Sequence, residues 1–290
     1  DAGGLNYTIK FEADDVVAVE SLPFSVLYQL MVVVQPELQT LAAQDLNAIS
    51  VELHDFDHNV VRQDNVSNVS VVMSQNGGKW YDGQLTGSMQ EQLQAGNANF
   101  SSLSIDAAGQ NYKLLFSAPN VLSVETVLFD VQYRLHVTNH PAARTIARGY
   151  LADVVAVIQD GKGRTIHQDS TSLIRAEIHA GIQHLFIGTH TAKADAGVLH
   201  FSSLMFSDPV DGVRLQFSSP LMFGTSSSFF DIVYQLKILD PGSIILFGLA
   251  RGVLPQVTVQ IWDQLSLIST ADNYAIAARL DIVWTPHQDG

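Results

Sequence analysis

The sequence predicts an all-β fold of tandem β-sandwiches. Short segments alternate apolar and polar residues, as strands with one buried face do, and turns rich in Asp and Gly separate them. No long stretch has the 3.6-residue periodicity of a helix. The pattern returns along the chain at intervals of about 100 residues, which is the size of a whole domain rather than of a solenoid repeat.

The clearest repeat joins residues 1–30 to residues 106–135. At a constant offset of 105 and without a gap, 14 of these 30 positions are identical. The identical pairs include Asn6/Asn111, Tyr7/Tyr112, Phe11/Phe116, Phe24/Phe129 and Tyr28/Tyr133. A segment this short rarely forms a core of its own, so we expect residues 1–30 to be the back half of a unit.

The offset of 105 continues downstream and later drops to 101. Further pairs are Pro36/Pro141, Ala42/Ala147, Asp55/Asp160, and the Phe-Ser-Ser-Leu segments that begin at Phe100 and Phe201. Two complete copies result, 31–135 and 136–236, and residues 237–290 resemble the first half of a third. The expected organisation is two complete domains between a C-terminal half-domain, 1–30, and an N-terminal half-domain, 237–290.

Each complete copy holds about seven short strands with frequent turns, which indicates an immunoglobulin-like (Ig-like) β-sandwich. An apolar-alternating strand that runs into an Asp-led turn occurs three times, over Ile49–Asp55, Val154–Asp160 and Val257–Asp263. With these motifs the chain resembles the tandem Ig-like repeats of extracellular adhesins and surface fibres. The resemblance implies an architecture rather than an activity. The chain has no cysteine, so the Cys…Trp…Cys pattern of antibody domains is absent.

The composition and net charge restrict the classes of partner that the chain can bind. The net charge is −14 and the pI about 4.9, so nucleic acids and anionic membranes are excluded as partners, and no segment is apolar enough for membrane insertion. Without cysteine there is no disulfide and no thiolate metal site. Four sequons favour an extracellular or cell-surface protein that carries covalent N-glycans, at Asn6, Asn65, Asn68 and Asn99.

The two half-domains predict a polymer interface. Strands with an open edge and an uncovered apolar face invite strand addition from another chain. The expected donor face comprises Tyr7, Ile9, Phe11, Phe24, Val26 and Tyr28, and the expected acceptor face Val257, Val259, Ile261, Leu280, Ile282 and Trp284. The partner of the chain would then be itself, in a head-to-tail homopolymer whose assembly logic resembles that of strand-complemented pilus-like fibres.

Three alternatives stay open. The chain can be a window on a longer array, in which the same polypeptide supplies the missing halves. The two halves can also pair within one chain that folds back. Finally, the chain can be an adhesin-type binding module that recognises a sugar or a surface protein, for instance through the turn at residues 54–58.

Sequence motifs of catalysis, metal binding and cofactor binding are absent, so we expect no enzyme, no metal site and no cofactor. His54-Asp55-Phe56-Asp57-His58 offers metal-ligand types, but the second copy keeps only the first Asp, which favours a solvated loop. Other histidines lack metal-site spacing, namely His179, His184, His190 and His200. Tryptophans could stack on sugars, but core or interface packing is expected of Trp80, Trp262 and Trp284.

Overall fold

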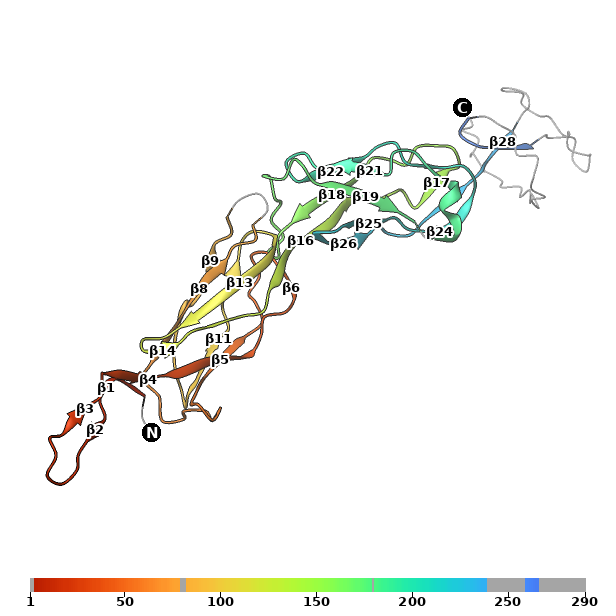
Figure 1. Ribbon diagram of the computed structural model, residues 1–290. Coiled ribbons are helices and arrows are strands. Elements are labelled where there is room, and N and C mark those ends of the chain that lie inside the picture. The colour runs from red at the N-terminus through yellow and green to blue at the C-terminus, as the bar shows by residue number, and fades with distance from the viewer. Residues whose placement is uncertain (1–2, 79–81, 179, 239–258, 266–290) are drawn as a thin grey trace, which may run out of the picture.

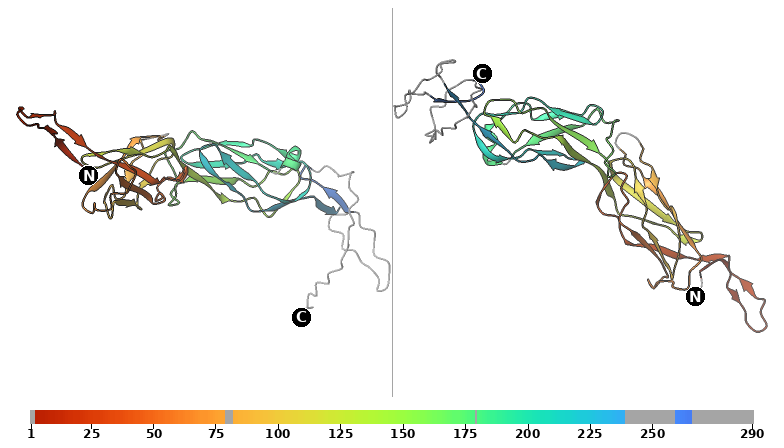
Figure 2. Two further views of the ribbon diagram at one scale, coloured as in Figure 1. Left: turned by 60° about the horizontal axis from the view of Figure 1, so that its bottom comes forward. Right: turned by 180° about the vertical axis from the view of Figure 1, so that it is seen from behind.

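The computed structural model describes residues 3–78, 82–178, 180–238 and 259–265. It is built from strands, with one short 3-10 helix, η1 (Ala180–Leu185), in the described part. Two Ig-like sandwiches lie end to end in an elongated molecule (Figure 1). We call them unit 1, from β5 to the first half of β16, and unit 2, from the second half of β16 to β27. Two further views show the same linear arrangement (Figure 2).

Unit 1 consists of two facing groups of strands. The first group has the order β11 (Asn97–Phe100), β7 (Ile49–His54), β5 (Tyr28–Val34) and β14 (Val121–Leu122), with β14 parallel to β5. The second group comprises β10 (Gln90–Gln92), β8 (Asn68–Gln75), β13 (Gly109–Ser117), β15 (Val124–Glu125), β16 (Phe129–Asn139) and β6 (Gln39–Leu41). The short strands β9 (Leu85–Thr86) and β12 (Ser104–Ile105) form a separate pair.

Unit 2 repeats this plan. Its first group is β22 (Val198–Phe201), β18 (Val154–Gln159), the second half of β16 and the parallel β26 (Met222–Ser226). Its second group comprises β21 (Thr191–Lys193), β19 (Leu173–Glu177), β25 (Gln216–Ser219), β24 (Val210–Val213), β27 (Phe230–Val233) and β17 (Arg144–Ile146). The short pair is β20 (Phe186–Ile187) with β23 (Met205–Phe206). The repeat in sequence is therefore a repeat in strand pairing.

Aromatic residues at repeated positions fill both cores. The rings of Phe100 and Phe116 lie 5.0 Å apart in unit 1, and those of Phe201 and Phe217 lie 5.0 Å apart in unit 2. Tyr112 is fully buried, and its hydroxyl donates a hydrogen bond to the carbonyl oxygen of Ala107 at 2.8 Å. Tilted aromatic pairs of this kind stabilise a core beyond the area that they bury.

Strand β16 passes from unit 1 into unit 2 without a linker. Its first residues pair with β13 and β6, and its last residues pair with β18. The turn of unit 2 that follows β18 also touches unit 1, because the backbone N–H of Gly161 donates to the carbonyl oxygen of Ala42 at 2.7 Å. A continuous strand and this contact together stiffen the joint between the two units.

Gly87 and Gly188 hold equivalent turns at φ +108° and +113°. A Cβ on Gly87 would lie 2.0 Å from the carbonyl oxygen of Ser102. We expect Gly87→Ala to destabilise unit 1 by on the order of 3 kcal/mol, because it adds a backbone clash to a strained conformation. Gly212→Ala is the control, since Gly212 has φ +63° and nothing within 4 Å, and it should cost only about 1 kcal/mol. Denaturant unfolding of both variants tests this, and equal losses would contradict it.

Candidate functional site

Residues 3–27 form one long hairpin, made of two nested strand pairs, that projects beyond unit 1 (Figure 1), and we call it the N-terminal half-unit. Strand β1 (Gly4–Tyr7) pairs with β4 (Phe24–Val26), and β2 (Lys10–Phe11) pairs with β3 (Val19–Glu20). The outer pair, β1 with β4, has the register of both complete units: Gly4/Val26, Gly109/Val131 and Val210/Ile232, then Tyr7/Phe24, Tyr112/Phe129 and Val213/Phe230. A left-handed residue sits in the bulge each time, at Asn6, Asn111 and Gly212.

A side-chain hydrogen bond recurs with the same geometry. The backbone N–H of Ile9 donates to the Ser21 hydroxyl at 2.9 Å. The corresponding bonds are Leu114 N–H to Thr126 Oγ1 at 3.1 Å and Leu215 N–H to Ser227 Oγ at 2.9 Å. The N-terminal half-unit therefore already has the local structure that the back half of a complete sandwich adopts.

Its apolar face, however, has no opposing sheet among the residues that the structure describes. Five of the six predicted donor side chains are between 39% and 59% exposed, namely Tyr7, Ile9, Phe11, Phe24 and Val26. Their equivalents in unit 1 are at most 2% exposed, namely Tyr112, Leu114, Phe116, Phe129 and Val131. Those in unit 2 are at most 3% exposed, namely Val213, Leu215, Phe217, Phe230 and Ile232. The sixth, Tyr28, begins β5 and is half-buried against the core of unit 1.

The backbone edge of β4 is open as well. In unit 1 the equivalent residues of β16 accept the parallel strand β6, with Thr40 opposite Val131. In unit 2, β27 accepts the parallel strand β17, with Thr145 opposite Ile232. Within the described ranges no strand pairs with this edge of β4. An apolar face and an unpaired edge thus coincide, as a site for strand addition requires.

At the opposite end of the molecule, the third copy starts as the other two do. Strand β28 (Gln235–Ile238) pairs with β29 (Val259–Trp262), with Leu236 opposite Ile261. This is the register of Leu135 with Ile158 in unit 2. Two of the predicted acceptor residues, Val259 and Ile261, lie half-buried in β29. The other four lie outside the described residues: Val257, Leu280, Ile282 and Trp284.

The turn at residues 54–58 is held by its own hydrogen bonds. His54 is buried, with Nε2 2.9 Å from a Glu52 carboxylate oxygen and Nδ1 2.9 Å from the carbonyl oxygen of His58. Asp55 Oδ1 accepts the backbone N–H of Asn59 at 2.8 Å, and this bond lowers the pKa of Asp55 below its ordinary value. Phe56 points into solvent and is 94% exposed.

The other histidines and tryptophans have separate surroundings. His190 stacks on Phe186 at 4.1 Å, and His200 Nδ1 lies 2.7 Å from Asp153 Oδ2. His184 is in η1, and Trp262 is half-buried in β29. His179, Trp80 and Trp284 lie outside the described residues. Across the residues that the structure covers, no group of three or more His, Asp or Glu side chains could hold a metal ion.

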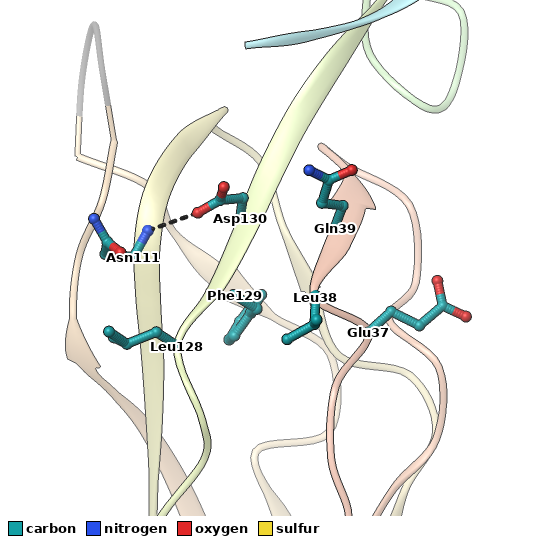
Figure 3. Close-up of a pocket in the computed structure, with 7 residues that line it drawn as sticks. All are labelled: Glu37, Leu38, Gln39, Asn111, Leu128, Phe129 and Asp130. Carbon is teal, nitrogen blue, oxygen red and sulfur yellow. Dashed lines mark hydrogen bonds between the residues drawn. The ribbon is translucent and has the colours of Figure 1, made fainter. Parts of the chain in front are cut away.

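A shallow hollow of about 670 Å³ lies on unit 1 (Figure 3) and is lined by Glu37, Leu38, Gln39, Asn111, Leu128, Phe129 and Asp130. Its polar feature is the bond from the Asn111 backbone N–H to Asp130 Oδ1, at 2.9 Å. Unit 2 repeats that bond between Gly212 and Asp231 at 2.9 Å. The bond therefore belongs to the scaffold of both complete units and is not a feature particular to the hollow.

All four predicted glycan acceptors are exposed: Asn6, Asn65, Asn68 and Asn99. Asn65 Oδ1 accepts the backbone N–H of Ala95 at 2.7 Å, a bond that the Ser170 hydroxyl makes to Ala196 in unit 2 at 3.0 Å. Glycan attachment stays a prediction. In the described part of the chain no helix has the length and apolar character needed to span a bilayer.

No protein-family model and no curated protein sequence matches the chain. Among solved structures, it is similar to a 282-residue C-terminal fragment of intimin, solved with the intimin-binding domain of the translocated intimin receptor. The two are 10% identical, and the match covers 73% of this chain and 66% of that fragment, with a TM-score of 0.38. The adhesin InvE of Yersinia pseudotuberculosis is 10% identical, and the match covers 71% of this chain and 58% of InvE, with a TM-score of 0.31.

The Escherichia coli adhesin FdeC is also similar, with 10% identity. That match covers 83% of this chain and 74% of FdeC, with a TM-score of 0.30. The chain spans less than two thirds of the intimin fragment and of InvE. At such scores the likeness extends to the fold class alone, and the strand pairing described above carries the Ig-like assignment.

The repeat alignment contained two features that the sequence-based site prediction missed. Val16 is equivalent to Val121, which pairs with Tyr28 in the parallel strand β14. Phe56 is equivalent to Gly161, which contacts unit 1. Both could have been found by asking which partner each repeated position has in a complete copy.

Proposed function

We propose that this chain is a structural section of an extracellular or cell-surface row of Ig-like sandwiches, completed by further copies of the repeat. In the filament form of this proposal, residues 1–30 of one chain complete the half-domain 237–290 of the next, giving a head-to-tail homopolymer. The observation that carries the proposal is that five side chains are exposed in the N-terminal half-unit although their equivalents are core residues in both complete units.

The complete units also supply a register for the joint. Val121 of β14 lies opposite Tyr28, and Met222 of β26 lies opposite Tyr133, both in parallel pairing. In the proposed joint the same register would bring Val16 of one chain opposite Tyr234 of another, just before β28. Among the described residues β28 pairs only with β29, so its second edge can accept this strand.

The energetics favour a tight joint. Burial of one large apolar side chain contributes roughly 1.5–3 kcal/mol to the free energy of association, and five such side chains are exposed on the half-unit. Association costs rigid-body freedom and side-chain ordering. The backbone ordering cost is reduced here, because both strand pairs of the hairpin already have the register of the complete units. The contact joins unlike surfaces at opposite ends of the molecule, so it propagates instead of closing.

A second candidate is an adhesin-type binding module within a longer array. Here the same polypeptide completes the half-unit, and a terminal region recognises a sugar or a surface protein. The continuous strand β16 favours this candidate, because a stiff row of sandwiches suits a stalk that presents a binding domain away from a surface. The described part of units 1 and 2 would then act as a spacer.

Sedimentation of the 1–290 chain over a range of concentrations distinguishes the two candidates. We expect large, concentration-dependent species that return to a 31.6 kDa chain on denaturation. That result supports completion by a second chain. A monodisperse monomer at every concentration contradicts the filament form and favours the array with its binding module.

A further inference from the structure

The contact between consecutive units occurs twice with the same geometry. At the first junction the backbone N–H of Gly161 in unit 2 donates to the carbonyl oxygen of Ala42 in unit 1, at 2.7 Å. At the second, the N–H of Gln264 donates to the carbonyl oxygen of Ala147 in unit 2, at 2.9 Å. Ala42 and Ala147 are equivalent, as are Gly161 and Gln264. The turn that follows the Asp of one unit therefore docks on a fixed segment of the preceding unit.

Side-chain size alternates across this junction. A Cβ built on Gly161 would lie 2.7 Å from Cβ of Gln44, so the first junction has room for one side chain, that of Gln44. Gly149 takes the place of Gln44 at the second junction, and its Cβ position lies 3.4 Å from Cγ of Gln264. Each junction thus opposes one glycine to one glutamine.

The charges at the two junctions also alternate. At each junction the Asp that begins the turn is paired with one arginine, which comes either from the same turn or from the preceding unit. Asp160 is paired within its own turn, with Arg164 Nε 2.7 Å from its Oδ2, and the preceding unit presents Ala43. Asp263 is paired across the junction, with Arg148 Nε 3.4 Å from its Oδ2. Arg148 is the equivalent of Ala43. Asp160 and Asp263 are both buried, at 2% and 5% exposure.

Unit 1 has the same turn, but nothing in the described part of the chain docks on it. Asn59 replaces Arg164, so the turn offers Asp55 no arginine like the one that pairs with Asp160, and Phe56 replaces Gly161. By the two observed junctions, this turn requires a cation and a glycine from the preceding unit. Ala250-Arg251-Gly252 repeats Ala147-Arg148-Gly149 in sequence. These three residues lie outside the described part of the chain.

We propose that the Asp55–Asn59 turn docks on the segment 250–252 of a second copy of this chain, with Arg251 paired to Asp55 and Phe56 packed over Gly252. The inference rests on the proposed function, since the half-unit that precedes unit 1 must be completed by residues 237–290. It also identifies the partner segment, because the third copy of the repeat offers this turn an arginine for Asp55 and a glycine for Phe56. The segment 42–44 does not fit, because it offers Ala43 and Gln44.

The charge pair is tested by a double-mutant cycle on self-association of the full chain. Arg251→Leu is expected to raise the dissociation constant about fivefold, as the loss of a partly exposed ion pair does. Combined with Asp55→Asn, which keeps the oxygen that accepts the Asn59 N–H, it should have no further effect. Asp57→Lys is the control, because Asp57 occupies the position of the exposed Lys162 and should leave association unchanged.

The size rule is tested by exchange. Gly252→Gln should weaken association tenfold or more, because it opposes two large side chains. Addition of Phe56→Gly should restore association, since the pair then matches Gln44 with Gly161. Misfolding cannot produce this rescue. If Phe24→Ala weakens association but neither the cycle nor the exchange shows coupling, the junction is wrong and strand completion stands. If the unaltered chain is a monomer throughout, both the second-copy partner and the filament form are wrong.

Discussion

A chain that lacks residues 1–26 is expected to remain monomeric at concentrations where the 1–290 chain forms large species. The truncation removes the five exposed side chains and the open edge of β4. It spares unit 1, because β5 begins at Tyr28 and pairs with β7 and β14. Sedimentation velocity measures the association, and thermal unfolding shows that units 1 and 2 keep their transitions.

Leu22→Ala is the matched control for this truncation. Leu22 is 87% exposed, more than any predicted donor side chain, but its equivalents Val127 and Ser228 are exposed in complete units. We expect this variant to associate as the unaltered chain does. Large species from the truncated chain would contradict completion through the half-unit. Loss of association in Leu22→Ala would point instead to non-specific apolar contact.

Much of the architecture follows from the sequence, because alternation and repetition are local signals. The strand before each Asp-led turn is where alternation places it, at β7, β18 and β29. The carboxylate of Asp55 accepts the N–H of Asn59, and that of Asp160 accepts the N–H of Arg164, so the Asp determines the turn by local hydrogen bonds. A residue that acts on its own neighbours is visible in sequence.

Features that depend on distant partners were not visible. The predicted boundary between residues 135 and 136 falls inside β16, and alternation does not show that one strand pairs in two units. The sequence predicts a solvated loop around Phe56, and Phe56 is 94% exposed, but a contact with a preceding unit would depend on residues far from this turn. The two observed junctions, Gly161 with Ala42 and Gln264 with Ala147, supply the basis for the proposed third one.

Phe24 and Phe129 occupy the same repeated position and should respond to alanine in opposite ways. Phe129 is 2% exposed, and Phe129→Ala is expected to destabilise unit 1 by about 3–5 kcal/mol through a cavity in its core. Phe24 is 41% exposed, so Phe24→Ala should change the unfolding of a dilute, monomeric chain by less than about 0.5 kcal/mol. Its cost should appear in association, as a dissociation constant raised roughly 10- to 100-fold.

The two readouts separate a core residue from a surface residue that becomes core. Denaturant unfolding at low concentration measures the first effect, and sedimentation at high concentration measures the second. If Phe24→Ala destabilises the monomer as Phe129→Ala does, the half-unit is already covered within one chain, which is the fold-back alternative. If it changes neither quantity, residues 1–30 are not completed by a second copy. A half-sandwich whose core forms between chains requires both results for Phe24→Ala: unchanged unfolding of the monomer and weakened association.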